Sequence, residues 1–170
     1  MRRADILEMA EQYFFVAMKN GWVAGIKGED VSGMPGYKKI DFAIGDFRIL
    51  DCWCVSDAGS AGTIIIWFMW PTHAPKPIWV MNYGGGLYRK EDVPFLKRAL
   101  MVAYERKEFS GGRGPVRYEE TAGGLIYSNR IEANTFEGFR GEENLYKPEG
   151  VRDLNPIRVG WHECWGMALI

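Results

Sequence analysis

The chain has 170 residues with 47% hydrophobic and 14% aromatic content, and its formal net charge is -1. This size and composition indicate one globular domain over residues 1–170 with a sizeable core, and they exclude a disordered chain. The near-zero charge argues against a duplex nucleic-acid-binding protein, because phosphate neutralisation normally requires a positive excess.

The N-terminal segment lacks the order of a signal peptide, and the longest apolar run, at 62–71, is too short to cross a bilayer. The three cysteines give no disulfide framework, which is typical of a reducing compartment. We therefore expect a cytoplasmic protein with no membrane partner.

The first predicted helix begins near Asp5 and ends at Gly21. Asp5 is followed three residues later by Glu8, which is close to a capping box, and apolar residues then recur with the helical period. A loop rich in Gly and Pro at 28–37 separates this helix from 39–55. The partial alternation in 39–55, with a glycine near its middle, predicts a β-hairpin.

Two short apolar runs follow at 62–70 and 76–83, and both are typical of strands covered on both faces. Three consecutive glycines, 84–86, end the second run. A phosphate-binding loop would open a helix and carry G-K-[ST] or G-x-G-x-x-G, and neither pattern is present. We interpret the glycines as the bent end of a strand, where their conformational freedom is needed.

A second helix is predicted over 93–106, with Asp92 as its N-cap and an apolar stripe along one side. A turn cluster at 109–118 follows, and then come three further strand candidates, 124–131, 139–146 and 157–170.

The element order is thus helix, three or four strands, helix, three strands, which is compatible with an internal α-β-β-β duplication. The predicted fold is α+β, with a strongly twisted antiparallel sheet of about six strands and two helices on one face.

Four segments resemble motifs of a known family. The segment K-P-I-W-V-M-N-Y at 76–83 is similar to the motif K-P-V-W-x-M-N-Y, and Arg113–Gly114–Pro115 matches an R-G-P turn after the second helix. Residues 139–143 match an F-x-G-x-E strand. The segment G-D-F-R-I-L-D-C-W resembles an aromatic strand with a central aspartate, which places that role on Asp51.

Through these motifs the chain resembles a bacterial family known as domain of unknown function 5680, over roughly residues 6–169. The chain departs from the family pattern at 60–67, where another F-x-G-x-E is usual, and at 161–166, where a tyrosine and glycines are usual. The family occurs alone or attached to helix-turn-helix DNA-binding domains. The resemblance therefore implies a fold and a sensory role, but no known chemistry.

Cys52, Cys54, His162 and Cys164 are candidate zinc ligands, since Cys-x-Cys and His-x-Cys supply zinc-ligand types. Residues i and i+2 of a strand share a face but stand about 6.7 Å apart, whereas zinc-bound sulfurs lie within about 4 Å of each other. We expect buried cysteines and no metal or other cofactor, with this zinc set as an alternative.

We assign no catalytic residue from the sequence. His162 or His73 with a Cys or Ser would be the nucleophile candidates, but no G-x-S-x-G elbow is present. Asp51 lies in mid-strand, where a charge needs a partner, and Arg113 could pair with Asp51 or with Glu143. Both a structural ion pair and a ligand contact remain open for these groups.

Aromatic side chains fall on both faces of the predicted strands, whereas two helices can cover only one face. Curling of the sheet, a second subunit or a small ligand would cover the other. The candidate ligand-binding residues are Asp51, Trp53, Trp79, Asn82, Tyr83 and Arg113.

We therefore predict a non-enzymatic small-molecule-binding or sensory domain with an aromatic cleft. The alternative is an interaction module that homodimerises through the open sheet face, followed by an unrecognised enzyme or a zinc-binding protein. The expected partners are a small-molecule ligand and a second copy of the chain, and no nucleic acid.

Overall fold

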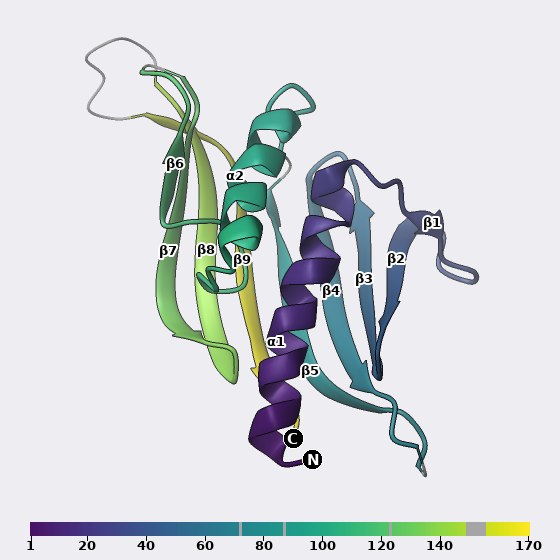
Figure 1. Ribbon diagram of the computed structural model, residues 1–170. Coiled ribbons are helices and arrows are strands. Elements are labelled where there is room, and N and C mark those ends of the chain that lie inside the picture. Colours follow the sequence, from purple (N-terminus) through teal and green to yellow (C-terminus); the bar gives the residue numbers. More distant parts are fainter. Residues whose placement is uncertain (72, 87, 123, 149–155) are drawn as a thin grey trace.

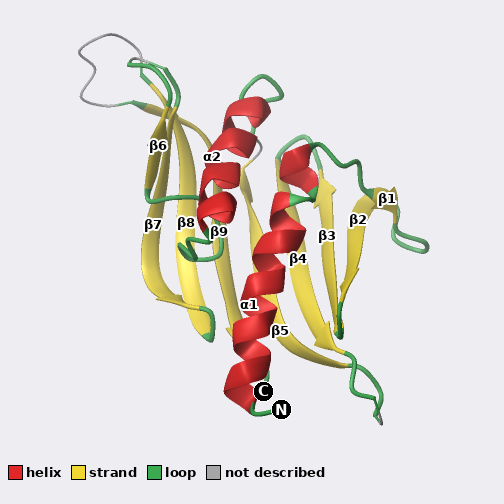
Figure 2. Cartoon of the chain, in the orientation of Figure 1, coloured by secondary structure: helices red, strands yellow, loops and turns green. Residues whose placement is uncertain are grey.

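A computed structural model describes residues 1–71, 73–86, 88–122, 124–148 and 156–170. These residues form two α-helices, a short 3-10 helix η1 (Trp22–Ala24) and one nine-stranded sheet (Figures 1 and 2). The helices are α1 (Arg3–Lys19) and α2 (Val93–Arg106). The strands are β1 (Glu29–Asp30), β2 (Tyr37–Ile44), β3 (Phe47–Val55), β4 (Gly59–Phe68), β5 (Lys76–Gly86), β6 (Arg117–Glu119), β7 (Ile126–Thr135), β8 (Gly138–Lys147) and β9 (Ile157–Ala168).

The strands lie in the order β1-β2-β3-β4-β5-β9-β8-β7-β6, and every neighbouring pair is antiparallel. Two meanders, β2 to β5 and β6 to β9, therefore meet where β5 pairs with β9. Both helices lie on the same face of the sheet, and α1 runs along the seam between the meanders (Figure 1).

The antiparallel sheet is confirmed, but the predicted fold of about six strongly twisted strands is wrong. The described residues form nine strands in a sheet that is only weakly twisted. No periodic pattern is visible in β1 and β6, because they are only two and three residues long. The helix α1 is followed by the five strands β1 to β5, and α2 by the four strands β6 to β9, rather than each by the three strands of the predicted α-β-β-β unit. A sheet this broad accommodates less twist.

The core lies between the helices and the sheet. Phe14 of α1 is fully buried, and its ring centroid lies 5.4 Å from that of Trp79 on β5. The Trp79 indole stacks on Phe136 at 4.7 Å and donates a hydrogen bond from Nε1 to the carbonyl oxygen of that residue. Trp79 is therefore a core residue that ties the seam of the sheet to α1.

Within the residues that the structure describes, the opposite face of the sheet carries no helix (Figure 1). Trp165 and Met167 of β9 are about half exposed there, at 49% and 48%. No helix in the described part of the chain is long and apolar enough to cross a membrane.

The three glycines are the last residues of β5, as interpreted from the sequence. A Cβ atom at Gly85 would lie 2.3 Å from the carbonyl oxygen of Trp161 and 3.0 Å from Cα of His162. Both positions belong to β9, so a glycine is needed for β5 to lie this close to β9. This close approach brings His162 toward the end of β4.

Candidate functional site

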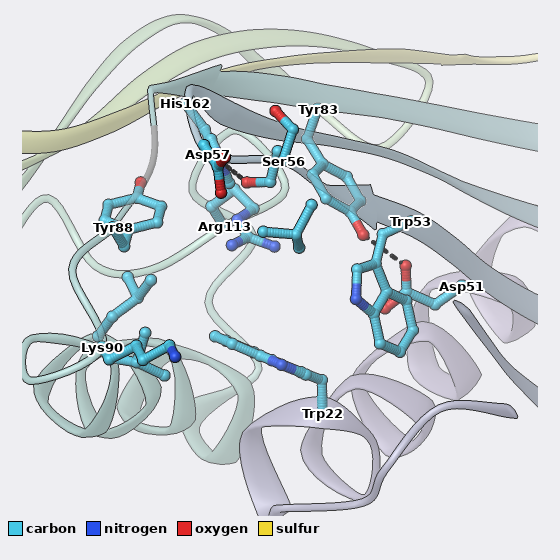
Figure 3. A pocket seen from close by; sticks show the side chains of 14 residues that line it. Trp22, Asp51, Trp53, Ser56, Asp57, Tyr83, Tyr88, Lys90, Arg113 and His162 are labelled. Atoms are coloured by element: carbon cyan, nitrogen blue, oxygen red, sulfur yellow. Dashed lines mark hydrogen bonds between the residues drawn. The ribbon is translucent and has the colours of Figure 1, made fainter. Parts of the chain in front are cut away.

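A pocket of about 400 Å³ opens on the helix-covered side of the sheet (Figure 3). Its residues come from η1, from the start of α2, from the ends of β3, β4 and β5, and from β9. Four aromatic side chains form much of its wall, with Tyr88 and Trp53 on opposite sides of the cavity. The aromatic residues are Trp22, Trp53, Tyr83 and Tyr88.

Trp22 is held in place by α2. The ammonium nitrogen of Lys97 lies 4.4 Å from the centroid of the indole ring, which is a cation–π contact. The 3-10 helix that begins at Trp22 follows directly on α1, and its end is set by Gly25 with φ of 91°. The sequence indicated only the end of a helix here, so Trp22 was missed as a pocket residue.

Behind the pocket lining lies a fully buried carboxylate, Glu143 of β8, which contacts the lining residues Tyr88, Arg113 and His162. Its Oε1 accepts hydrogen bonds from Nη2 of Arg113 and from the Tyr88 hydroxyl, each at 3.0 Å. Its Oε2 accepts a hydrogen bond from the Tyr127 hydroxyl at 3.0 Å. Burial favours the protonated acid, but the positive charge of Arg113 and the contact with His162 hold the pKa of Glu143 well below its usual range.

His162 of β9 contacts this carboxylate on one side and a hydroxyl group on the other. Its Nδ1 lies 3.2 Å from Oε1 of Glu143, and its Nε2 lies 2.7 Å from Oγ of Ser60. Ser60 is the second residue of β4 and lines the pocket. The strands β4, β8 and β9 thus bring Ser60, Glu143 and His162 together, although β4 is far from the other two in the sequence.

Asp51 of β3 provides a second carboxylate in the pocket lining. Its Oδ1 accepts a hydrogen bond of 2.7 Å from the Tyr83 hydroxyl. Burial raises the pKa of Asp51 to about 6, although the Tyr83 hydrogen bond and the charge of Arg113 act in the opposite direction. This carboxyl group therefore changes its charge close to neutral pH.

Arg113 lies between the two carboxylates and pairs with Glu143, one of the two partners expected from the sequence. Its guanidinium carbon also lies 5.2 Å from the centroid of the Tyr83 ring. Its Nε is buried without a hydrogen-bond partner among the described residues. Arg113 and Glu143 together form a structural ion pair at the base of the pocket.

The structure gathers four of the six predicted ligand-binding residues, Asp51, Trp53, Tyr83 and Arg113, at one pocket. Trp79 lies on the same face as Tyr83 but deep beneath α1. Asn82 alternates with Tyr83 and so faces the uncovered side of the sheet, opposite Thr63 and Trp165.

The four residues of the zinc alternative are not brought together. Cys52 and Cys54 alternate with the pocket residue Trp53 and lie on the uncovered face of the sheet. His162 and the buried Cys164 lie on the helix-covered face. No group of three or more potential metal ligands occurs in the part of the chain that the structure describes.

Sequence reasoning also missed Ser60 and Tyr88. Neither residue lies in a motif, and each reaches the site only through the pairing of distant strands. His73, the other histidine considered for nucleophilic chemistry, is not among the pocket residues.

A family model described as "Domain of unknown function (DUF5680)" matches residues 62–153, which is more than half of the chain. The chain belongs to this family. The DUF5680 match begins within β4 and includes Tyr83, Tyr88, Arg113 and Glu143, whereas Asp51, Ser60 and His162 lie outside it. No curated protein and no solved structure matches the chain.

Proposed function

We propose that this DUF5680 protein is a small-molecule-binding or sensory domain that holds its ligand in the pocket between η1, α2 and the sheet. The observation that carries the proposal is the convergence of four aromatic side chains on a cavity of about 400 Å³ that ends in a few fixed polar groups. Ligand sites typically have this size and this combination of apolar walls and convergent polar groups.

The lining favours a flat, mostly apolar molecule with one polar end. The rings of Trp22, Trp53 and Tyr88 offer stacking surfaces, while the polar end would meet Asp51 or the Ser60–His162 pair. Because Glu143 neutralises Arg113, the base of the pocket carries little net charge. A neutral or weakly ionised ligand suits this site better than a multiply charged one.

The sensory part of the proposal rests on the family resemblance, which implies bacterial relatives attached to helix-turn-helix regulators. Such a domain would work in the cytoplasm and pass on the presence of its ligand to a partner.

Ligand-observed NMR with a panel of small flat aromatic compounds tests the binding. Compounds that bind in the pocket should lose at least about tenfold in affinity when Trp53→Ala removes one wall, which corresponds to about 1.4 kcal/mol. The matched control is Trp165→Ala on the uncovered face, which should leave binding unchanged. The absence of any binder, or equal losses in the two variants, would contradict the proposal.

A second candidate function, homodimerisation through the uncovered sheet face, is favoured by the exposure of Trp165 and Met167 on that face. Sedimentation velocity over a range of concentrations tests it. A dimer that dissociates in Trp165→Glu would support this function, and a monomer at every concentration would contradict it.

A further inference from the structure

A serine, a histidine and a glutamate lie in the order of a nucleophile, a base and an acid, with Ser60 and His162 in the pocket lining and Glu143 buried behind them. The Ser60 hydroxyl is 2.7 Å from Nε2 of His162, and Nδ1 of this histidine is 3.2 Å from Glu143 Oε1. This constellation recurs on unrelated folds and is recognised by geometry and roles, since no sequence order is common to them.

We propose that Ser60 is a nucleophile that attacks the acyl group of a small carboxylic ester bound in this pocket, with His162 as its general base. The inference rests on the proposed binding function and adds a reaction to it.

The surroundings of Glu143 suit the role of the acid in a serine–histidine–acid triad. Arg113, Tyr88 and Tyr127 all donate hydrogen bonds to its carboxylate, and Arg113 and His162 keep it ionised despite complete burial. His162 Nδ1 lies 3.2 Å from the ionised carboxylate but makes no hydrogen bond of good geometry among the described residues. A small rotation of the imidazole would point the Nδ1 proton at Glu143, which leaves Nε2 free to accept the Ser60 proton. Glu143 would also stabilise the imidazolium formed in that step, so it acts as a positioning residue.

The surroundings of Ser60 suit the nucleophile position. The residue follows the β3–β4 turn, and its side chain lines the same cavity as the aromatic wall. Gly85, its partner on the neighbouring strand, allows β5 to approach β9 closely at His162. A ligand held against the aromatic rings would therefore place a polar end group near the Ser60 hydroxyl.

The reaction balances with water as the co-reactant. Ser60 Oγ bonds to the ester carbonyl carbon while its proton moves to Nε2 of His162, and the carbonyl π electrons move to oxygen. Collapse of this intermediate breaks the bond to the alkoxy oxygen, and the alcohol leaves with the proton from His162. Water then adds to the acyl-serine by the same route, which releases a carboxylic acid and restores Ser60.

Arg113 is the cationic side chain that would stabilise the negative oxygen of the intermediates, with the part of its charge that Glu143 leaves uncompensated. It lines the pocket, and Figure 3 shows its guanidinium group next to His162. A fixed positive group of this kind lowers the energy of an oxyanion in a site with limited water.

An ester with an apolar acyl or aryl group is the substrate class that the lining favours. The aromatic walls accommodate such groups. Phosphate esters suit the pocket less well, because the charge of Arg113 is already shared with Glu143.

The full-length chain can be tested with an alkyl fluorophosphonate probe, which releases fluoride when a reactive serine bonds to its phosphorus. Intact-mass and peptide analysis should show one phosphonyl group on Ser60 and none in Ser60→Ala. The control is Ser128→Ala, because Ser128 of β7 is not among the pocket residues. This control should label as the unmodified protein does.

Hydrolysis of p-nitrophenyl acetate and butyrate gives a second readout. The Ser60→Ala and His162→Gln variants should each lower kcat/KM by about a hundredfold or more, as expected for loss of a nucleophile or of its base.

Two outcomes separate this inference from the binding function. Persistent aromatic binding without labelling of Ser60, or with equal hydrolysis by Ser60→Ala, would overturn the nucleophile and leave the binding function intact. If the unmodified protein is not labelled by the probe and binds no aromatic compound, the nucleophile and the binding function are both overturned.

Discussion

Glu143 and Asp51 are two buried carboxylates beside the same pocket, and their pKa values are shifted in opposite directions. Glu143 receives hydrogen bonds from Arg113, Tyr88 and Tyr127, and its pKa is held well below the usual range. Asp51 receives one hydrogen bond, from Tyr83, and its pKa is raised to about 6.

The difference shows that burial alone does not decide whether a carboxyl group is charged. Burial raises the pKa in both cases, and the number and charge of the partners then decide the direction of the shift. Glu143 thus stays an anion paired with Arg113, whereas Asp51 in the pocket lining is an acid that can take up a proton near neutral pH.

The largest expected effect follows from neutralising Glu143. The substitution Glu143→Gln leaves the charge of Arg113 buried without its counterion, and we expect a loss of about 3–5 kcal/mol in the free energy of unfolding at pH 7. Urea denaturation followed by circular dichroism measures this loss.

The control for this substitution is Glu142→Gln at the neighbouring position. Glu142 is partly exposed and pairs with Arg130 and Arg158 on the uncovered face, so its loss should cost at most about 1 kcal/mol. Similar losses in the two variants would mean that the buried pair contributes no more than a surface one.

An effect of opposite sign is expected at Asp51. A folded-state pKa above the unfolded value contributes stability below about pH 4 that is lost as the pH rises through about 6. The Asp51→Asn variant avoids this loss and keeps an acceptor for Tyr83. Its unfolding free energy relative to the unmodified protein should therefore rise by about 2 kcal/mol between pH 4 and pH 7.5. A difference that does not vary with pH would show that Asp51 has an ordinary pKa.

The smallest effects should come from the tyrosine hydroxyls. Tyr83→Phe removes the only hydrogen bond shown to Asp51 within the described residues, so the pKa of Asp51 should rise by about 0.5 to 1 unit. Tyr88→Phe removes one of several partners of Glu143, which should stay ionised in the neutral range. Carboxyl ¹³C NMR titration of both variants checks this contrast, and equal shifts would contradict it.

The sequence was most informative where the pattern is local. The apolar stripe and Asp92 predicted α2 with its observed bounds, Val93–Arg106, although Asp92 pairs with Arg89 instead of capping the helix through its side chain. Long strands with β-branched and aromatic residues were also found, whereas β1 and β6 were not, because two or three residues show no period.

The site was predictable only in part, for a geometric reason. A charge in mid-strand and neighbouring aromatic residues indicated Asp51, Trp53 and Tyr83. Trp79 has the same alternation as Tyr83, but it lies about 13 Å further along the strand, where α1 covers the sheet. Alternation predicts the face of a strand and does not predict which part of that face a helix will cover.

The cluster around Glu143 could not be predicted from any short segment of the sequence. Ser60, Glu143 and His162 meet because β4, β5, β9 and β8 pair in that order with one particular register. Only the possible pairing of Arg113 with Glu143 was anticipated from charge considerations. A four-strand register depends on the whole fold and leaves no pattern in a short segment.

The glycines at the end of β5 affect how much of the protein must rearrange when a ligand binds. At Gly85 an added Cβ would lie 2.3 Å from the Trp161 carbonyl oxygen, so the spacing of β5 and β9 is set by main chain packed on main chain. Main chain paired in a sheet has no rotamers to rearrange when a ligand binds. The strands that carry Tyr83 and His162 therefore keep their spacing on binding, and the entropy lost by the protein is limited to its side chains.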